Sequence, residues 1–200
     1  MKPLAVALSV VVAVTLAGCA SNAVAPTGVA QSGTPTASAA PSATATPTPE
    51  YDIGPDGGCD PRQLDISVRS RPHDSGAGNF YWQLEYSNVS PVDCSLEGNP
   101  TIAQLDAGGE QVGALSGVEQ VNGSGSVPLR SGATAYSIIH FSQAGNYGCA
   151  VLDVASIRVT IPHRDESTAV VLPVPDTIQG CDSEQVTFYS GSITAAQQPG

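Results

Sequence analysis

Apolar and polar side chains alternate along several stretches of this chain, and this period of two limits the possible folds more than any other feature. From residue 64 to 69, apolar Leu64, Ile66 and Val68 alternate with Asp65, Ser67 and Arg69. From residue 80 to 87, Phe80, Trp82, Leu84 and Tyr86 alternate with Tyr81, Gln83, Glu85 and Ser87. Because successive side chains of a β-strand point to opposite faces, both stretches are predicted to be half-buried strands.

Further strands are predicted where β-branched and aromatic residues gather between glycines and prolines. The segments 101–105 and 111–114 flank Asp106-Ala107-Gly108-Gly109, a sequence suited to a hairpin. The other candidates are 133–141, 156–161, 168–172 and 186–193, with turns expected at Gly123-Ser124-Gly125 and Pro173-Val174-Pro175. No window carries an apolar stripe of helical period longer than two turns.

Many short strands without helices predict an all-β fold in which the apolar face of each sheet must cover another sheet. We therefore expect an antiparallel, immunoglobulin-like sandwich of about 7 to 9 strands. Trp82, which lies between two cysteines, is similar to the core tryptophan of immunoglobulin domains, although the cysteine spacing differs.

The first eighteen residues have the features of a secretory signal. Lys2 precedes an apolar run from Leu4 to Thr15, which is too short to span a bilayer. Leu16, Ala17 and Gly18 then lead to Cys19, and these four residues resemble the lipobox of bacterial lipoproteins. The resemblance implies cleavage after residue 18 and lipidation of Cys19, whose acyl chains would hold the protein on the extracytoplasmic face of the cell membrane.

Residues 19–50 are predicted to be a disordered tether, and residues 51–197 a single β-sandwich domain. The tether is rich in Ala, Ser, Thr and Pro and has no aromatic residue, so it cannot bury enough apolar area to fold. It is a spacer or, as Ser/Thr-rich tracts with proline can be, a glycosylated stalk. Asp52, Asp56 and Asp60 lack the ligand spacing of an EF-hand, and we expect them to form a flexible, acidic entry to the first strand.

Four cysteines remain in the domain once Cys19 is assigned to lipid, and an even number in an exported domain predicts two disulfides. Three pairings are possible. We favour Cys59 with Cys94 and Cys149 with Cys181, because this pairing closes two sequence-local loops. A four-cysteine metal site is a weaker alternative, since no pair is spaced as Cys-x-x-Cys.

The cysteines belong to a wider resemblance. The segments Tyr86-Ser87-Asn88-Val89-Ser90, Cys94-Ser95-Leu96-Glu97-Gly98-Asn99-Pro100 and Leu129-Arg130-Ser131-Gly132-Ala133-Thr134-Ala135 are similar to an uncharacterised domain of actinobacterial cell-envelope lipoproteins. That family has an opening cysteine pair, an Asn-x-Ser turn, the motif Cys-x-Leu-x-Gly-x-Pro and a late cysteine pair. The resemblance spans Cys59 to Cys181 and implies an envelope location, but it assigns no reaction and no catalytic residue.

No catalytic motif is present, and we expect neither an enzyme nor a cofactor. There is no Gly-x-Ser-x-Gly elbow, and a surface or packing role is expected for each histidine. His73, His140 and His163 are weak candidates for a metal site if the strands bring them together. Nucleic acid is not an expected partner, because six arginines and no lysine remain beside eighteen acids once the signal is removed.

The sequence therefore predicts a noncatalytic binding or interaction module that engages an envelope protein or a glycan. Four tyrosines could supply rigid contact area on exposed faces: Tyr81, Tyr136, Tyr147 and Tyr189. An exposed aromatic cluster on one sheet face would support this function. The alternative is a lipoprotein of the envelope that handles a metal or binds a small ligand.

Overall fold

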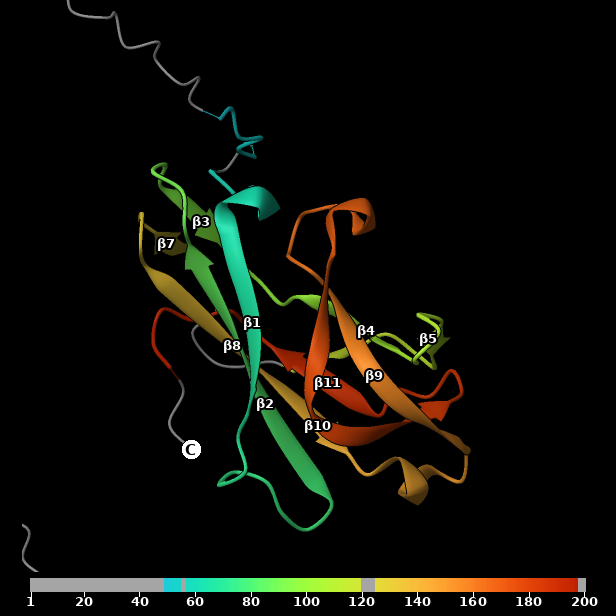
Figure 1. Ribbon diagram of the computed structural model, residues 1–200. Helices are drawn as coiled ribbons and strands as arrows, with labels where there is room; N and C mark the ends of the chain where they lie inside the picture. Colours follow the sequence, from blue (N-terminus) through green and yellow to red (C-terminus); the bar gives the residue numbers. More distant parts are fainter. Residues whose placement is uncertain (1–48, 55–56, 120–124, 198–200) are drawn as a thin grey trace, which may run out of the picture. The chain divides into compact units, whose positions relative to one another are not determined.

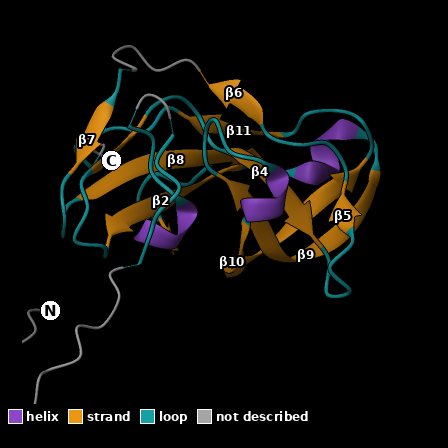
Figure 2. Cartoon of the chain, turned by 90° about the horizontal axis from the view of Figure 1, so that it is seen from above, coloured by secondary structure: helices purple, strands orange, loops and turns teal. Residues whose placement is uncertain are grey.

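The structure is a computed structural model that describes residues 49–54, 57–119 and 125–197. Strands make up about half of these residues, and helix is confined to three short turns of 3-10 type (Figures 1 and 2). These turns are η1 (Pro61–Gln63), η2 (Ala144–Tyr147) and η3 (Glu166–Thr168). The predicted all-β class is confirmed.

Two larger sheets and one small sheet organise the described residues. The five-stranded sheet has the order β1 (Leu64–Ser70), β2 (Asn79–Asn88), β8 (Thr134–Ser142), β11 (Phe188–Gly191) and β6 (Gly117–Glu119). The four-stranded sheet has the order β10 (Val170–Asp182), β9 (Ala150–Thr160), β4 (Thr101–Leu105) and β5 (Gln111–Val112). The third sheet pairs β3 (Cys94–Leu96) with β7 (Val127–Leu129). Figure 1 shows β1, β2 and β8 on the left and β4, β5 and β9 on the right.

One hydrophobic core is shared by the two larger sheets. Trp82 on β2 packs edge-on against Phe141 on β8, with ring centroids 4.5 Å apart, and Phe141 stacks on Phe188 at 5.4 Å. Ile157 on β9 and Ile102 on β4 belong to the same buried cluster. Each fully buried side chain of this size contributes about 1.5 to 3 kcal/mol. The predicted alternation is thus realised, because each sheet turns its apolar positions toward the other.

Register within the five-stranded sheet follows the sequence pattern closely. Leu64 and Ile66 are buried on β1, and Trp82, Leu84 and Tyr86 are buried on β2. On β2, two positions of the predicted alternation depart from the expected burial. Phe80 is 40% exposed although it shares the inner face, and Gln83 on the outer face is buried. The burial of Gln83 is tolerated because both ends of its amide are hydrogen-bonded. Its Nε2 donates to Glu85 at 3.1 Å, and its Oε1 accepts from Arg71 at 3.4 Å.

The described residues contain more strands than expected, eleven in all, because several pairings involve only two or three residues. The predicted hairpin is confirmed, with β4 and β5 joined through a turn in which the Gly109 N–H donates to the Asp106 carbonyl oxygen. One pairing is not antiparallel, since β6 runs parallel to β11.

The prediction that Pro173-Val174-Pro175 separates two strands is wrong. These residues lie inside β10, and the pairing with β9 is interrupted only between Pro173 and Ile178. Proline is tolerated there because β10 is the edge strand of its sheet, so its missing N–H removes no bond to a further strand.

Both disulfides have the favoured pairing. Cys59 joins Cys94 with Cα atoms 4.8 Å apart, and Cys149 joins Cys181 with Cα atoms 5.7 Å apart. The first attaches the segment before η1 to β3, and the second links the residue before β9 to its neighbour β10. Neither bond connects the five-stranded sheet to the four-stranded sheet.

Candidate functional site

Arg164 follows β9 and holds the segment that precedes η1. Its Nε–H donates to the carbonyl oxygen of Cys59 at 3.0 Å. Its Nη2 donates to the carbonyl oxygens of Asp52 at 2.6 Å and Gly58 at 2.9 Å, and its Nη1 pairs with the Asp52 carboxylate at 3.3 Å. The side chain is only 13% exposed. Four of its five N–H donors are therefore used to fix this segment.

Asp60 is buried and caps η1. Its carboxylate accepts from the backbone N–H groups of Asp52 at 2.7 Å and Arg62 at 2.9 Å, and it pairs with the Arg62 guanidinium. The Arg62 side chain and the two backbone donors outweigh burial and lower the pKa of Asp60 to about 2. Gln63 completes a capping box, since its Oε1 accepts from the Asp60 N–H at 2.8 Å.

We call Asp52, Asp60, Arg62 and Arg164 the entry clamp. The expected flexible, acidic entry is corrected for two of its three aspartates, because both are tied to arginines. Asp56 lies outside the described residues. The clamp carboxylates are ordered by pairing with cations of this chain, and pairing of this kind differs from the open oxygen cage of a calcium loop.

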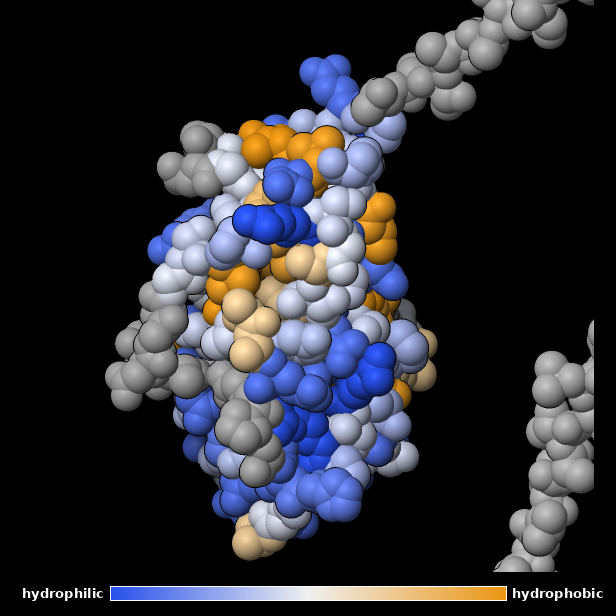
Figure 3. Space-filling model, turned by 90° about the vertical axis from the view of Figure 1, so that its left-hand side faces the viewer, coloured by the Kyte–Doolittle hydropathy of each residue, from blue (hydrophilic) through white to orange (hydrophobic). Residues whose placement is uncertain are grey.

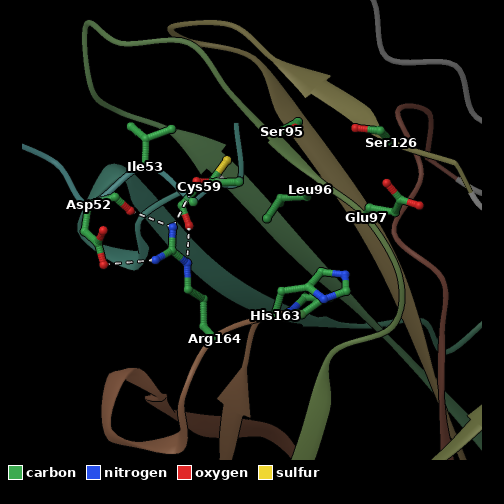
Figure 4. A pocket seen from close by; sticks show the side chains of 12 residues that line it. Asp52, Ile53, Cys59, Ser95, Leu96, Glu97, Ser126, His163 and Arg164 are labelled. Atoms are coloured by element: carbon green, nitrogen blue, oxygen red, sulfur yellow. Dashed lines mark hydrogen bonds and ion pairs between the residues drawn. The ribbon is translucent and has the colours of Figure 1, made fainter. Parts of the chain in front are cut away.

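A pocket of about 450 Å³ opens beside the entry clamp. Figure 4 shows Arg164 turned toward Asp52 and Cys59, whereas His163, Leu96 and Glu97 line the opposite part of the pocket. His163 is exposed and has a positive φ of 61°. The pocket thus combines an apolar wall at Leu96 with a histidine and a carboxylate that face solvent.

A second cluster stands on the outer face of the five-stranded sheet. Tyr81 on β2 lies opposite His140 on β8, and His140 lies opposite Tyr189 on β11. The rings of Tyr81 and His140 stack with centroids 4.5 Å apart and planes 9° from parallel. We call Tyr81, His140 and Tyr189 the aromatic strip. It crosses three neighbouring strands at one level of the sheet.

Tyr189 ends the strip against strand β6. It pairs with Gly117, and a Cβ on Gly117 would lie 2.6 Å from Cδ1 of the Tyr189 ring. The ring therefore occupies the space that any side chain at residue 117 would need. More than a third of Tyr189 remains exposed, which leaves ring surface available for a partner.

Polar groups border the strip. The Nε2 atom of His140 is 2.9 Å from Oδ1 of Asn79, and its Nδ1 is 3.9 Å from Oε1 of Glu119. The next level of the outer face carries Arg69, whose guanidinium pairs with Glu85 at 3.1 Å. Figure 3 shows the side on which β2 and β8 lie in Figure 1, and its lower half is predominantly hydrophilic. The strip is consequently an aromatic feature within a polar surface.

The three histidines are not brought together. His73 lies in the turn before β2, His140 in β8, and His163 after β9. Among the residues that the structure describes, no three His, Cys, Asp or Glu side chains form a group suited to a metal ion. His140 is hydrogen-bonded to Asn79, and the Glu119 carboxylate lies 3.9 Å away, which falls short of three metal ligands.

The four candidate tyrosines separate into two kinds. Tyr81 and Tyr189 belong to the strip, and Tyr136 lies on the same outer face of β8, opposite Glu85. Tyr147 lies apart from them, in η2. The sequence did not reveal Gly117 or Glu119, because β6 is only three residues long and pairs with a strand far along the chain. The sequence also gave no role to Arg164. Its one hint was that the domain has only six arginines beside eighteen acids, so each arginine has several carboxylates to pair with.

The residues of the expected family motif are structural. Cys94 is in a disulfide, Leu96 and Pro100 are buried, and Gly98 has a φ of +96° that favours glycine. Asn88 forms the expected turn, its Oδ1 accepting from the Ser90 N–H at 3.0 Å. These positions hold loops and sheet ends in place, so the motif encodes the fold.

Eleven strands in three sheets, a shared core and two disulfides define the class as a disulfide-bonded all-β domain. The chain belongs to the family described as "Domain of unknown function (DUF4232)", whose family model matches residues 59–190. That range includes all four cysteines of the domain and the whole aromatic strip. No curated protein matches the chain, and no solved structure matches it.

Several predictions concern residues outside those that the structure describes. They are the signal at 1–18, the lipobox residues Leu16, Ala17 and Gly18, the lipidated Cys19, and the tether as far as residue 48. Across residues 49–54, 57–119 and 125–197, no helix has the length and hydropathy needed to cross a membrane.

Proposed function

We propose that this protein is a noncatalytic binding module of the cell envelope that engages its partner through the outer face of the five-stranded sheet. The observation that carries the proposal is the aromatic strip, which places two tyrosines and a histidine at one level of three adjacent strands. Tyrosine provides a large, rigid and amphipathic contact area at a low cost in conformational entropy.

A noncatalytic role is supported by the positions of the two acidic groups whose pKa values are shifted, Asp60 and Tyr86. The carboxyl of Asp60, with its lowered pKa, caps η1, and burial raises the pKa of the Tyr86 phenol within the core, where its Oη lies 3.0 Å from Ser137 Oγ. Both shifts arise from packing and capping contacts.

The test is site-specific photocrosslinking in living cells. A photoreactive residue at Ser67, an exposed outer-face position on β1 opposite Glu85, should capture a discrete partner. Capture should be lost when Tyr81→Ala and Tyr189→Ala are added. The matched control places the same residue at Val171, which is 55% exposed on β10 of the other sheet. Equal capture from both positions would contradict the proposal.

We propose further that Cys19 is lipidated and that residues 19–50 act as a tether, so that the domain works on the extracytoplasmic face of the membrane. The support is the sequence itself, in which an apolar run ends in Leu16-Ala17-Gly18-Cys19. Cys19→Ala should move the protein from the membrane fraction to the soluble fraction without changing its melting temperature. Retention of the variant in the membrane fraction would refute the anchor.

The finer class of the fold that we propose is an immunoglobulin-like sandwich. Its support is the shared core and the buried Trp82 on β2, which donates from Nε1 to Asp176 at 3.0 Å on the edge strand of the facing sheet. Amide-to-amide contacts measured by NMR test this assignment, because they report strand order and sheet packing.

A second candidate function is the binding of a small ligand in the pocket beside the entry clamp. The pocket of about 450 Å³ is within the size range of small-molecule sites and joins apolar Leu96 to His163 and Glu97. A thermal-shift screen with small amphipathic acids and amines is the test. A shift that disappears in His163→Ala would favour this function over the first.

A further inference from the structure

We infer that the occupant of the aromatic strip is an uncharged pyranose glycan, an inference that rests on the proposed binding function. A sugar ring has apolar C–H faces and a rim of hydroxyls. It therefore requires aromatic surface with hydrogen-bonding groups immediately around it. The strip has this composition within a small area of three adjacent strands.

The aromatic surface is supplied by Tyr189. Its ring is seated over Gly117, where no side chain competes for the space, and more than a third of the residue remains exposed. Tyr81 and His140 stack on each other, so each covers one face of its neighbour. Their ring edges face outward together with the Tyr81 hydroxyl, which is suited to hydrogen bonds with hydroxyl groups.

Hydrogen-bonding groups from β6 and β2 border the rings. Glu119 pairs with Gly191 on β11, its side chain is 45% exposed, and its Oε1 is 3.9 Å from His140 Nδ1. Asn79 contacts the other imidazole nitrogen at 2.9 Å. A carboxylate accepts hydrogen bonds from hydroxyls, and the amide both donates and accepts, so these two groups match the rim of a sugar.

A protein partner fits this face less well. The buried centre of a protein interface is apolar and poor in charge. Of the described large apolar side chains that are exposed, only Tyr189 occupies an outward position on the strands of this sheet. The other outward positions include Asp65, Arg69, Glu85 and Glu119. A polar face with one exposed ring favours a hydroxyl-rich ligand.

The charge of the domain selects against anionic polymers. Six arginines accompany eighteen acids, and every one of these residues lies at position 50 or beyond. Like charges across a contact oppose association. The Arg69 guanidinium is already paired with Glu85, so it is partly neutralised. Uncharged glycans are therefore the class of ligand that is compatible with both the aromatic rings and the negative charge of the domain.

The experiment is a binding titration of the purified full-length protein with three hexasaccharides, made of N-acetylglucosamine, of mannose, and of a sulfated disaccharide repeat. At least one uncharged hexasaccharide should bind, and the sulfated one should not. Tyr189→Ala should weaken binding at least about tenfold, whereas Tyr189→Phe, which keeps the ring, should stay within about threefold. Glu119→Ala, on an exposed edge strand, is an independent variant that should also weaken binding.

Tyr147→Ala is the matched control, because it removes a half-buried tyrosine from η2; it should leave affinity within about twofold. Binding of neither uncharged sugar, preference for the sulfated sugar, or unchanged affinity in both Tyr189→Ala and Glu119→Ala would each overturn the inference. If no sugar binds while Ser67 crosslinking still captures a strip-dependent protein, the glycan inference fails and the binding module stands. If both fail, both proposals fall.

Discussion

The entry clamp and the aromatic strip are both built around charged or polar side chains, yet they use them in opposite ways. In the clamp, Arg164 uses its guanidinium on groups of its own chain and is 13% exposed. In the strip, Tyr189 is held by backbone pairing and keeps exposed ring surface. A cluster of charged or polar side chains is therefore a candidate binding site only where part of it remains exposed instead of being used within the chain.

The strongest test of this comparison removes the Cys59–Cys94 disulfide beside the clamp. Replacing both cysteines by alanine should lower the free energy of unfolding by about 4 kcal/mol, because the bond closes a loop of 35 residues. For a domain of this size, the melting temperature should fall by roughly 10 °C. Calorimetry of the oxidised wild type and the variant measures the difference. An unchanged melting temperature would show that the bond contributes nothing to the free energy of unfolding.

Arg164→Ala should have the next largest effect, at about 2 to 3 kcal/mol of unfolding free energy. It leaves the carbonyl oxygens of Asp52, Gly58 and Cys59 without their side-chain donor. Arg130→Ala is the matched control, since Arg130 is exposed in the turn after β7. Chemical denaturation measures both variants. If they behave alike, the clamp is dispensable.

Asp60→Asn should cost about 1 to 2 kcal/mol near neutral pH, because it keeps an acceptor but loses the charge that pairs with Arg62. The pKa of Asp60 is lowered to about 2, so its stabilising effect is complete above the ordinary value near 3.8 and is lost as the pH falls through about 2. Unfolding curves of wild type and variant should therefore converge between those two values. Asp65→Asn, an exposed outer-face acid of β1, serves as control. A constant gap at all pH values would contradict the assignment.

The smallest effect on stability is expected at the strip. Tyr189→Ala should change the free energy of unfolding by only about 0.5 kcal/mol, because the residue is exposed and lies outside the core cluster. A large loss of stability, measured by the same denaturation curves, would mean that the strip is structural like the clamp. The contrast between the two regions would then disappear.

The sequence correctly predicted those structural features that depend on residues close together along the chain. The alternation of Leu64, Ile66 and Val68 located β1, and the turn at Asp106 located the β4–β5 hairpin. The favoured cysteine pairing is also observed, because local loop closure is a short-range argument. The full length of β10 was not predicted. Pro173 and Pro175 indicate the end of a strand unless the strand is known to lie at the edge of its sheet.

The candidate site could not be assembled in the same way. Tyr81 and Tyr189 were both candidates for exposure, but only the register of β2, β8 and β11 places them on either side of His140. Gly117 and Glu119 reach the strip through a parallel pairing that local sequence does not encode. Arg164 meets Asp52 across more than a hundred residues. Each of these contacts depends on topology, which no local pattern specifies.

The entry clamp also determines how the domain carries mechanical load. A force that pulls residue 49 away from the domain acts first on the hydrogen bond from Arg62 to the Glu50 carbonyl oxygen. It acts next on the bonds from Arg164 to Asp52. Beyond them the covalent link from Cys59 to Cys94 passes tension into β3 before it reaches β1. The force is thus shared among η1, the segment after β9 and the small sheet. Strand β1 is consequently protected from being peeled away one hydrogen bond at a time.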